Sequence, residues 1–184
     1  MFLPFAYAVC TVPLWPSRWV SALGVASLTL VSAVTLLGAE VQAQAATGAP
    51  PLTRRALISA KATLAALVYL LSVGAAAATT AVSGRNAVSL ATLALAHAPV
   101  VVASVMIFSL LAYVVEEGLP PGDLYSRMLY LLLPFSLGFL TLATPAVAYA
   151  LALWLLKHPA PLTLLALVAL AELAAAALVL AASR

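Results

Sequence analysis

Charged side chains are scarce in this sequence. Only 7% of its 184 residues are Asp, Glu, Lys or Arg, whereas 66% are hydrophobic. A soluble domain carries about 25% charged residues, so this chain has too little polar surface to cover a globule in water. The shortage excludes a soluble fold and predicts an integral membrane protein in contact with the lipid bilayer.

Alternation between apolar and polar residues is also lacking. A membrane β-barrel needs segments of about 10 residues in which the two kinds alternate. This sequence has long unbroken runs rich in Ala and Leu, which favour helix. Because a membrane-spanning helix needs about 20 apolar residues, we expect an all-α fold, a polytopic bundle of transmembrane helices in a single domain.

Residues that perform chemistry are few. The single cysteine, Cys10, excludes an intramolecular disulfide and a multi-cysteine metal site, and we expect it to be a small buried residue. The chain has no G-x-x-x-x-G-K-[ST] motif for ATP and no H-E-x-x-H motif for zinc. We therefore expect no catalytic residue, no metal and no cofactor in this chain. The net charge of +3 fits basic loops beside anionic lipid, so no nucleic-acid partner is expected.

Polar breaks divide the sequence into about six apolar segments. The predicted ranges are 1–15, 19–38, 57–82, 87–115, 124–156 and 162–182. The first contains Pro4 and Pro13, so it either spans the membrane or lies as a re-entrant or interfacial piece. The fifth would form a helix of about 50 Å against about 30 Å of hydrocarbon. Because it also contains Pro134 and Pro145, it is either a kinked helix or a span followed by a re-entrant piece.

The distribution of basic residues predicts the orientation. If the loop around residues 40–60 is cytoplasmic and the spans alternate, five of the eight Lys and Arg residues lie inside. Cytoplasmic loops carry the excess of such residues. We therefore expect a plasma-membrane protein whose N- and C-termini are both cytoplasmic.

The most polar stretch is EVQAQAATGAPPLTRRALISAK, residues 40–61. Thr53 is a favourable N-cap for the helix that follows it. The first turns of that helix carry Arg54, Arg55 and Lys61, and cations at a helix N-terminus oppose the helix dipole. This placement indicates an external binding partner, either lipid headgroups or the surface of another protein.

The same stretch resembles the cytoplasmic segment of ABC-type export permeases. Those proteins carry a pattern like E-R-G-T-L-E-x-L-L-x-x-P-[VIL]-[ST]-R-R-x-[LI]-x-x-x-K after their second span. Residues 51–61 match its second half in register, and Glu40 lies eleven residues before Pro51, as the glutamate of the pattern does. The sequence departs from the pattern at Val41 and throughout residues 42–48.

This resemblance implies a function. In the family the segment is a coupling helix that docks on a separate ATPase subunit, which binds ATP and Mg²⁺. Two permease subunits, identical or different, form the export pathway, and each has six spans with a re-entrant element before the last. The residues expected to contact the ATPase are Glu40, Pro51, Thr53, Arg54, Arg55 and Lys61.

An acidic patch in the second polar break is a further candidate. Glu116, Glu117 and Asp123 are expected on the same side of the membrane as Arg54 and Arg55. They either form a second contact with the ATPase, pair with those arginines, or belong to a solvated loop.

Two polar residues inside predicted spans form a candidate intramembrane site. A carboxylate near the bilayer centre is costly, so Glu172 is either a proton, cation or substrate site or a neutral group that packs against a neighbouring helix. His97 is either a ligand of a metal or haem, or a hydrogen-bonding group inside the bundle.

Two other functions remain open. A small accessory subunit of a large membrane assembly, such as a respiratory complex, would also be apolar and lack chemistry of its own. A proton-coupled carrier would use Glu172. Neither function needs a separate ATPase.

Small residues that allow close helix contact are also abundant. Gly74 and Ala78 have the small-x-x-x-small spacing of packed membrane helices. In so alanine-rich a sequence, this spacing does not indicate which helix faces meet.

Overall fold

The computed structural model describes residues 3–11, 20–33, 53–118, 124–156 and 162–182, and these residues form helices and a turn at residues 83–86, with no strand among them. The predicted all-α class is therefore confirmed. The described helices are α1 (Leu3–Cys10), Val20–Ala33, α3 (Arg54–Val82), α4 (Ala87–Gly118), α5 (Leu124–Leu156) and α6 (Leu162–Ala182).

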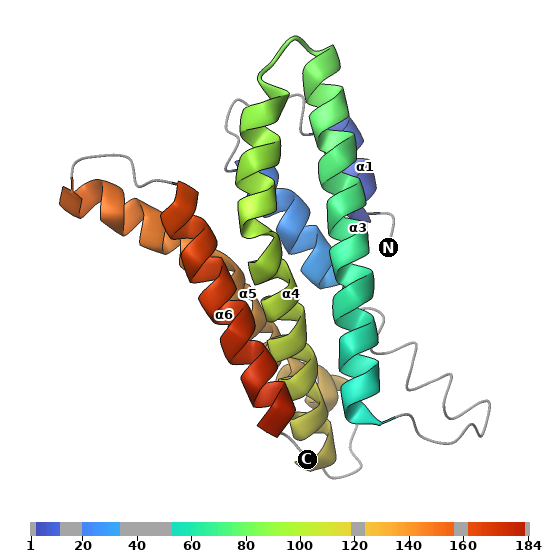
Figure 1. Cartoon of the computed structure of the whole chain (residues 1–184). Helices are drawn as coiled ribbons and strands as arrows, with labels where there is room; N and C mark the ends of the chain where they lie inside the picture. Colours follow the sequence, from blue (N-terminus) through green and yellow to red (C-terminus); the bar gives the residue numbers. More distant parts are fainter. Residues whose placement is uncertain (1–2, 12–19, 34–52, 119–123, 157–161, 183–184) are drawn as a thin grey trace.

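Four helices in the described ranges are long and apolar enough to cross a membrane. They comprise α3, residues 87–114 of α4, residues 132–152 of α5, and α6. The chain is thus a transmembrane helical bundle. Figure 1 shows α4 between α3 and α6, with α5 crossing behind them. Since α4 has the most buried apolar stretch of the four, it is the centre of the bundle.

The described part of the first segment, residues 3–11, contains a short helix, α1. With eight residues, α1 is about 12 Å long and cannot cross the hydrocarbon by itself. It packs on α3, where Thr79 Oγ1 donates to the Ala8 carbonyl oxygen at 3.4 Å. The expectation that Cys10 is buried was wrong, because it is exposed at the end of a helix that buries only Pro4 and Ala8.

Local sequence signals set the start of α3 and the turn that joins α3 to α4. Thr53 is the N-cap of α3, as predicted, and its side chain accepts a hydrogen bond from the Ala56 amide. Gly84 takes a positive φ of 71° in the turn after α3, a conformation that glycine adopts without strain. Asn86 then accepts from the Ser89 amide at 3.0 Å and caps α4.

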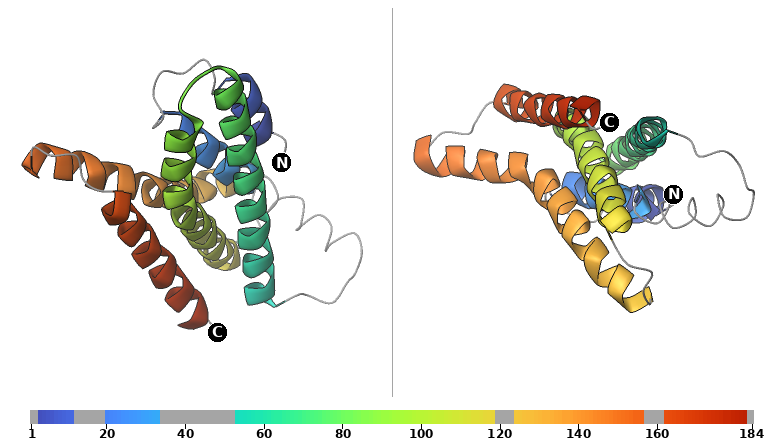
Figure 2. Two further views of the ribbon diagram at one scale, coloured as in Figure 1. Left: turned by 45° about the horizontal axis from the view of Figure 1, so that its top comes forward. Right: turned by 90° about the horizontal axis from the view of Figure 1, so that it is seen from below.

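The fifth apolar run is one continuous helix. α5 covers all 33 residues and contains Pro134 and Pro145. Figure 2 shows its course bending along the bundle, as expected where proline removes a main-chain hydrogen bond and crowds the preceding turn. Between the prolines, Gly138 lies against α4, where an added Cβ would meet the Phe108 Cβ and the Ser104 carbonyl oxygen, both at 3.2 Å.

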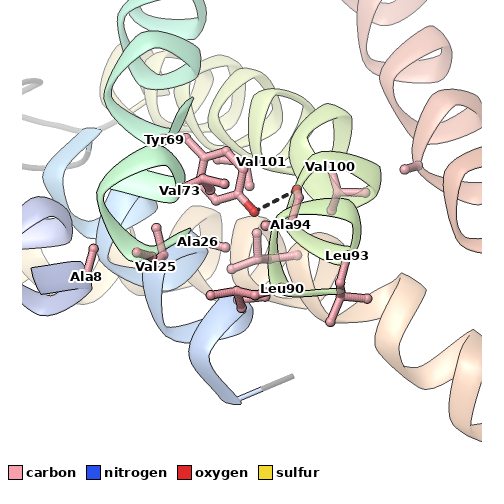
Figure 3. Packing of buried hydrophobic residues seen from close by; sticks show 14 of the residues in the cluster. Ala8, Val25, Ala26, Tyr69, Val73, Leu90, Leu93, Ala94, Val100 and Val101 are labelled. Carbon is pink, nitrogen blue, oxygen red and sulfur yellow. Dashed lines mark hydrogen bonds between the residues drawn. The ribbon is translucent and has the colours of Figure 1, made fainter. Parts of the chain in front are cut away.

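The largest core cluster joins all these helices around the first half of α4. It includes residues of α1, Val20–Ala33, α3, α4, α5 and α6. Figure 3 shows Tyr69 of α3 reaching into this cluster, where its hydroxyl donates to the Ala94 carbonyl oxygen at 3.0 Å. Pro99 lies one turn further along α4. Tyr69 therefore ties α3 to α4 next to the proline of α4.

We expect Tyr69→Phe to lower the free energy of unfolding by about 0.6–1.5 kcal/mol, the range for one interhelical hydrogen bond in a membrane protein. The substitution keeps the buried ring and removes only the hydroxyl, which donates to Ala94. Reversible unfolding in a detergent mixture, followed by circular dichroism, measures the change. An unchanged stability would contradict a contribution from this bond.

Candidate functional site

Three helix ends meet at one end of the bundle, which we call the basic end. It comprises the N-terminal end of α3, with Arg54 and Arg55, and the C-terminal ends of α4 and α6 (Figure 1). The Arg55 Nε donates to the Leu180 carbonyl oxygen at 3.2 Å, and its Nη2 donates to the Ala181 carbonyl oxygen. The last four carbonyls of a helix have no partner within that helix. Arg55 therefore caps α6 and places its positive charge at the negative end of that helix's dipole.

Lys61 makes a second link at the basic end. Only 3% of its surface is exposed, and its Nζ donates to the Tyr113 hydroxyl of α4 at 3.4 Å. The same Nζ lies 5.1 Å from the centre of the Tyr113 ring, within the range of cation–π attraction. A lysine predicted to contact a partner protein is thus directed into the bundle and joins α3 to α4.

Arg54 lies in a different environment from Arg55. It is half-buried, and consecutive residues of a helix point about 100° apart, so Arg54 does not share the direction of Arg55. The first turn of α3 contains no acidic residue. The charged side chains in the first turn of α3, Arg54 and Arg55, are therefore both positive.

An apolar groove opens beside these contacts. It lies between α4 and α6, has a volume of about 240 Å³, and every residue that lines it is apolar. Leu180 belongs to its lining and also supplies the carbonyl oxygen that accepts from Arg55. The groove therefore ends next to a guanidinium group.

Other predicted contact residues lie outside what the structure describes. Glu40, Pro51 and Asp123 fall in undescribed ranges. Glu116 and Glu117 lie in the last turns of α4, at the basic end, but their side chains are not described. Their proposed contacts with the arginines or with a partner therefore stay predictions.

The two intramembrane candidates both face α5. His97 is 2% exposed and lies beside the main chain of Leu142, while Glu172 of α6 lies beside the side chain of Thr144. His97 Nε2 and Glu172 Oε2 are buried without a hydrogen-bond partner among the described residues. No group of three or more His, Cys, Asp or Glu side chains that could hold a metal occurs in the described ranges. A functional role for either residue stays a prediction.

Two participants in this site were missed from the sequence, Tyr113 and the α4–α6 groove. A signal for Tyr113 existed, because tyrosine is enriched where membrane helices reach the interface and this residue lies near the end of an apolar run. The groove had no signal, because it depends on how two uniformly apolar helices cross.

No family model, curated protein sequence or solved structure matches this chain.

Proposed function

We propose that this chain is the membrane subunit of an ATP-driven exporter and that a separate ATPase subunit docks at its basic end. The observation that carries the proposal is the set of links made there by the first two turns of α3. Arg55 bonds to the C-terminal end of α6, and Lys61 bonds to Tyr113 of α4. A force applied to the segment before α3 would reach two other spans through polar contacts.

The hydrogen-bond chemistry suits such a transmitting role. Both links use a cationic donor, and hydrogen bonds to charged groups contribute about 1.5–3 kcal/mol, roughly twice the neutral value. Arg54 lies about 100° from Arg55 around the helix and, in this proposal, meets the acidic surface of the ATPase. A rotation of the start of α3 would then move α4 and α6 together, which is the kind of coupled helix motion that opens a pathway.

The proposed exporter contains two membrane subunits, either two copies of this chain or this chain and a related one. The apolar stretches of α5 and α6 are the least buried of the four spans. In this proposal, the outward faces of α5 and α6 contact the second subunit and the surrounding lipid. The export pathway is proposed to form between the two subunits.

The test is a pull-down of the tagged chain from membranes in mild detergent, with partners identified by mass spectrometry. We expect the wild type to recover a P-loop ATPase and Arg54→Glu to recover at least tenfold less, since reversing a charge in an interface costs several kcal/mol. Arg85→Glu is the matched control, because this arginine lies in the turn between α3 and α4, at the other end of the hairpin. Size-exclusion chromatography checks that both variants are folded.

The pull-down also separates this proposal from its rivals. Recovery of haem- or iron–sulfur-bearing subunits without an ATPase would contradict the exporter and support an accessory role in a respiratory-type assembly. Recovery of no partner, with proton-dependent transport abolished by Glu172→Gln, would support a carrier. Equal ATPase recovery with Arg54→Glu would contradict docking at Arg54.

A further inference from the structure

We propose that the groove between α4 and α6 binds one acyl chain of an anionic phospholipid and that Arg55 binds the phosphate of that lipid. This inference goes beyond the exporter proposal and does not depend on an ATPase. It follows from the joint position of an apolar groove and an exposed guanidinium at the end of one helix pair.

The shape of the groove suits a slender apolar chain. Its volume of about 240 Å³ lies below the range of about 300–1,000 Å³ typical of pockets for drug-sized ligands. The lining runs from Met106 to Leu111 on α4 and from Ala175 to Leu180 on α6, which is about 8 Å along each helix. Ala175 and Val179 at its edge are exposed, so the groove is open to the surrounding lipid.

The orientation of the groove matches that of a lipid. The two helices are parallel neighbours, because the earlier residue Ala169 of α6 shares a cluster with Val100 of α4, while the later Ala176 shares one with Met106. The Leu111 and Leu180 end therefore lies toward the C-terminal ends of both helices, at the basic end. A chain in the groove would point into the bilayer from a headgroup beside Arg55.

The guanidinium of Arg55 has N–H donors that are not used by its contacts with α6. An arginine side chain carries five N–H groups, and the structure uses the Nε and one Nη2 group of Arg55 for the carbonyls of α6. Arg55 is exposed, so three N–H groups can reach a ligand. Guanidinium and phosphate form strong, directional, charge-assisted hydrogen bonds. The capping contact holds Arg55 beside the groove, which reduces the entropy lost when the lipid binds.

The charge at the start of α3 favours an anionic headgroup over a zwitterionic one. Arg55 and the N-terminal end of the α3 dipole are positive, and α3 has no acid in its first turn. The negative end of α6 is already neutralised by Arg55. A headgroup that carries its own ammonium would place a second cation in this field, whereas phosphatidylglycerol would not.

The experiment uses the purified full-length chain in mild detergent and follows its thermal unfolding during titration with phosphatidylglycerol or phosphatidylcholine of identical acyl chains. Phosphatidylglycerol is expected to raise the Tm more strongly. We expect Arg55→Ala to raise the half-saturating lipid concentration about tenfold, as for the loss of one charge-assisted contact. Ala175→Phe, which fills the groove from its exposed edge without touching Arg55, is expected to reduce the shift in Tm similarly.

Matched controls test the Arg55 contact with the phosphate and the groove for the acyl chain separately. Arg54→Ala removes the neighbouring charge, and Ala174→Phe adds the same ring one position away, outside the lining of the groove; both are expected to keep the lipid response. Because Arg55→Ala also removes the cap of α6, only the lipid-dependent shift is compared. Equal responses to the two lipids, an equal loss with Arg54→Ala, or an unchanged response in Ala175→Phe would each overturn the proposal.

Discussion

Gly138→Leu is expected to lower the free energy of unfolding by about 3 kcal/mol, the upper end of the cost of overpacking a close contact. At this position α5 crosses α4 so closely that a Cβ would lie 3.2 Å from the Ser104 carbonyl oxygen and from the Phe108 Cβ. Both neighbours are close to or part of the main chain of α4, so neither can rotate away. A leucine would force the two helices apart and weaken the packing of Phe108, which is 1% exposed.

Gly74→Leu is the matched control. Gly74 also lies within a long apolar helix, but no atom lies within 4 Å of the Cβ that a substitution would add. This variant is expected to be neutral, or more stable by up to about 1 kcal/mol, because glycine is a poor helix former. Denaturation of both variants in mixed micelles, followed by circular dichroism, measures the difference. Similar stabilities for the two variants would show that the α4–α5 crossing can relax without cost.

These two glycines show that the sequence did not predict which helix faces come into contact. Both interrupt long apolar runs, and the small-x-x-x-small spacing at Gly74 and Ala78 did not indicate which helix faces meet. A close approach between two helices occurs at Gly138, because helices pack through whichever faces their crossing brings together. Local signals were more informative, since the cap at Thr53 depends only on neighbouring residues and is present.

In the candidate site too, the helices could be predicted from the sequence and the contacts between them could not. Hydropathy was enough to predict an all-α membrane bundle, and it placed the start of α3 within a few residues. It did not predict that Arg55 caps α6 or that Lys61 is buried against Tyr113, because both contacts join residues that are far apart in the sequence. The sequence resemblance interprets these cations as surface contacts for an ATPase. The geometry adds that two of them also hold the bundle together.

Tyr113→Leu is expected to lower the free energy of unfolding by about 2–3 kcal/mol, because it removes both the hydroxyl and the ring that face the buried Lys61 ammonium. Lys61→Met alone is expected to change stability by less than about 1 kcal/mol, since replacing a buried charge by an apolar side chain of similar length removes its desolvation cost along with its contacts. The two variants therefore have unequal effects although they break the same contact.

A double-mutant cycle measures the coupling energy between Lys61 and Tyr113. In the Lys61→Met background, Tyr113→Leu is expected to cost only about 1 kcal/mol, which gives a coupling of about 1–2 kcal/mol between the two side chains. Equal costs of Tyr113→Leu in both backgrounds would show that Lys61 does not depend on Tyr113 and instead extends its ammonium to the interface. The cycle also bears on the proposed exporter. If Lys61→Met is stable but ATP-driven transport is lost while ATPase binding persists, the link from α3 to α4 serves transmission and not docking.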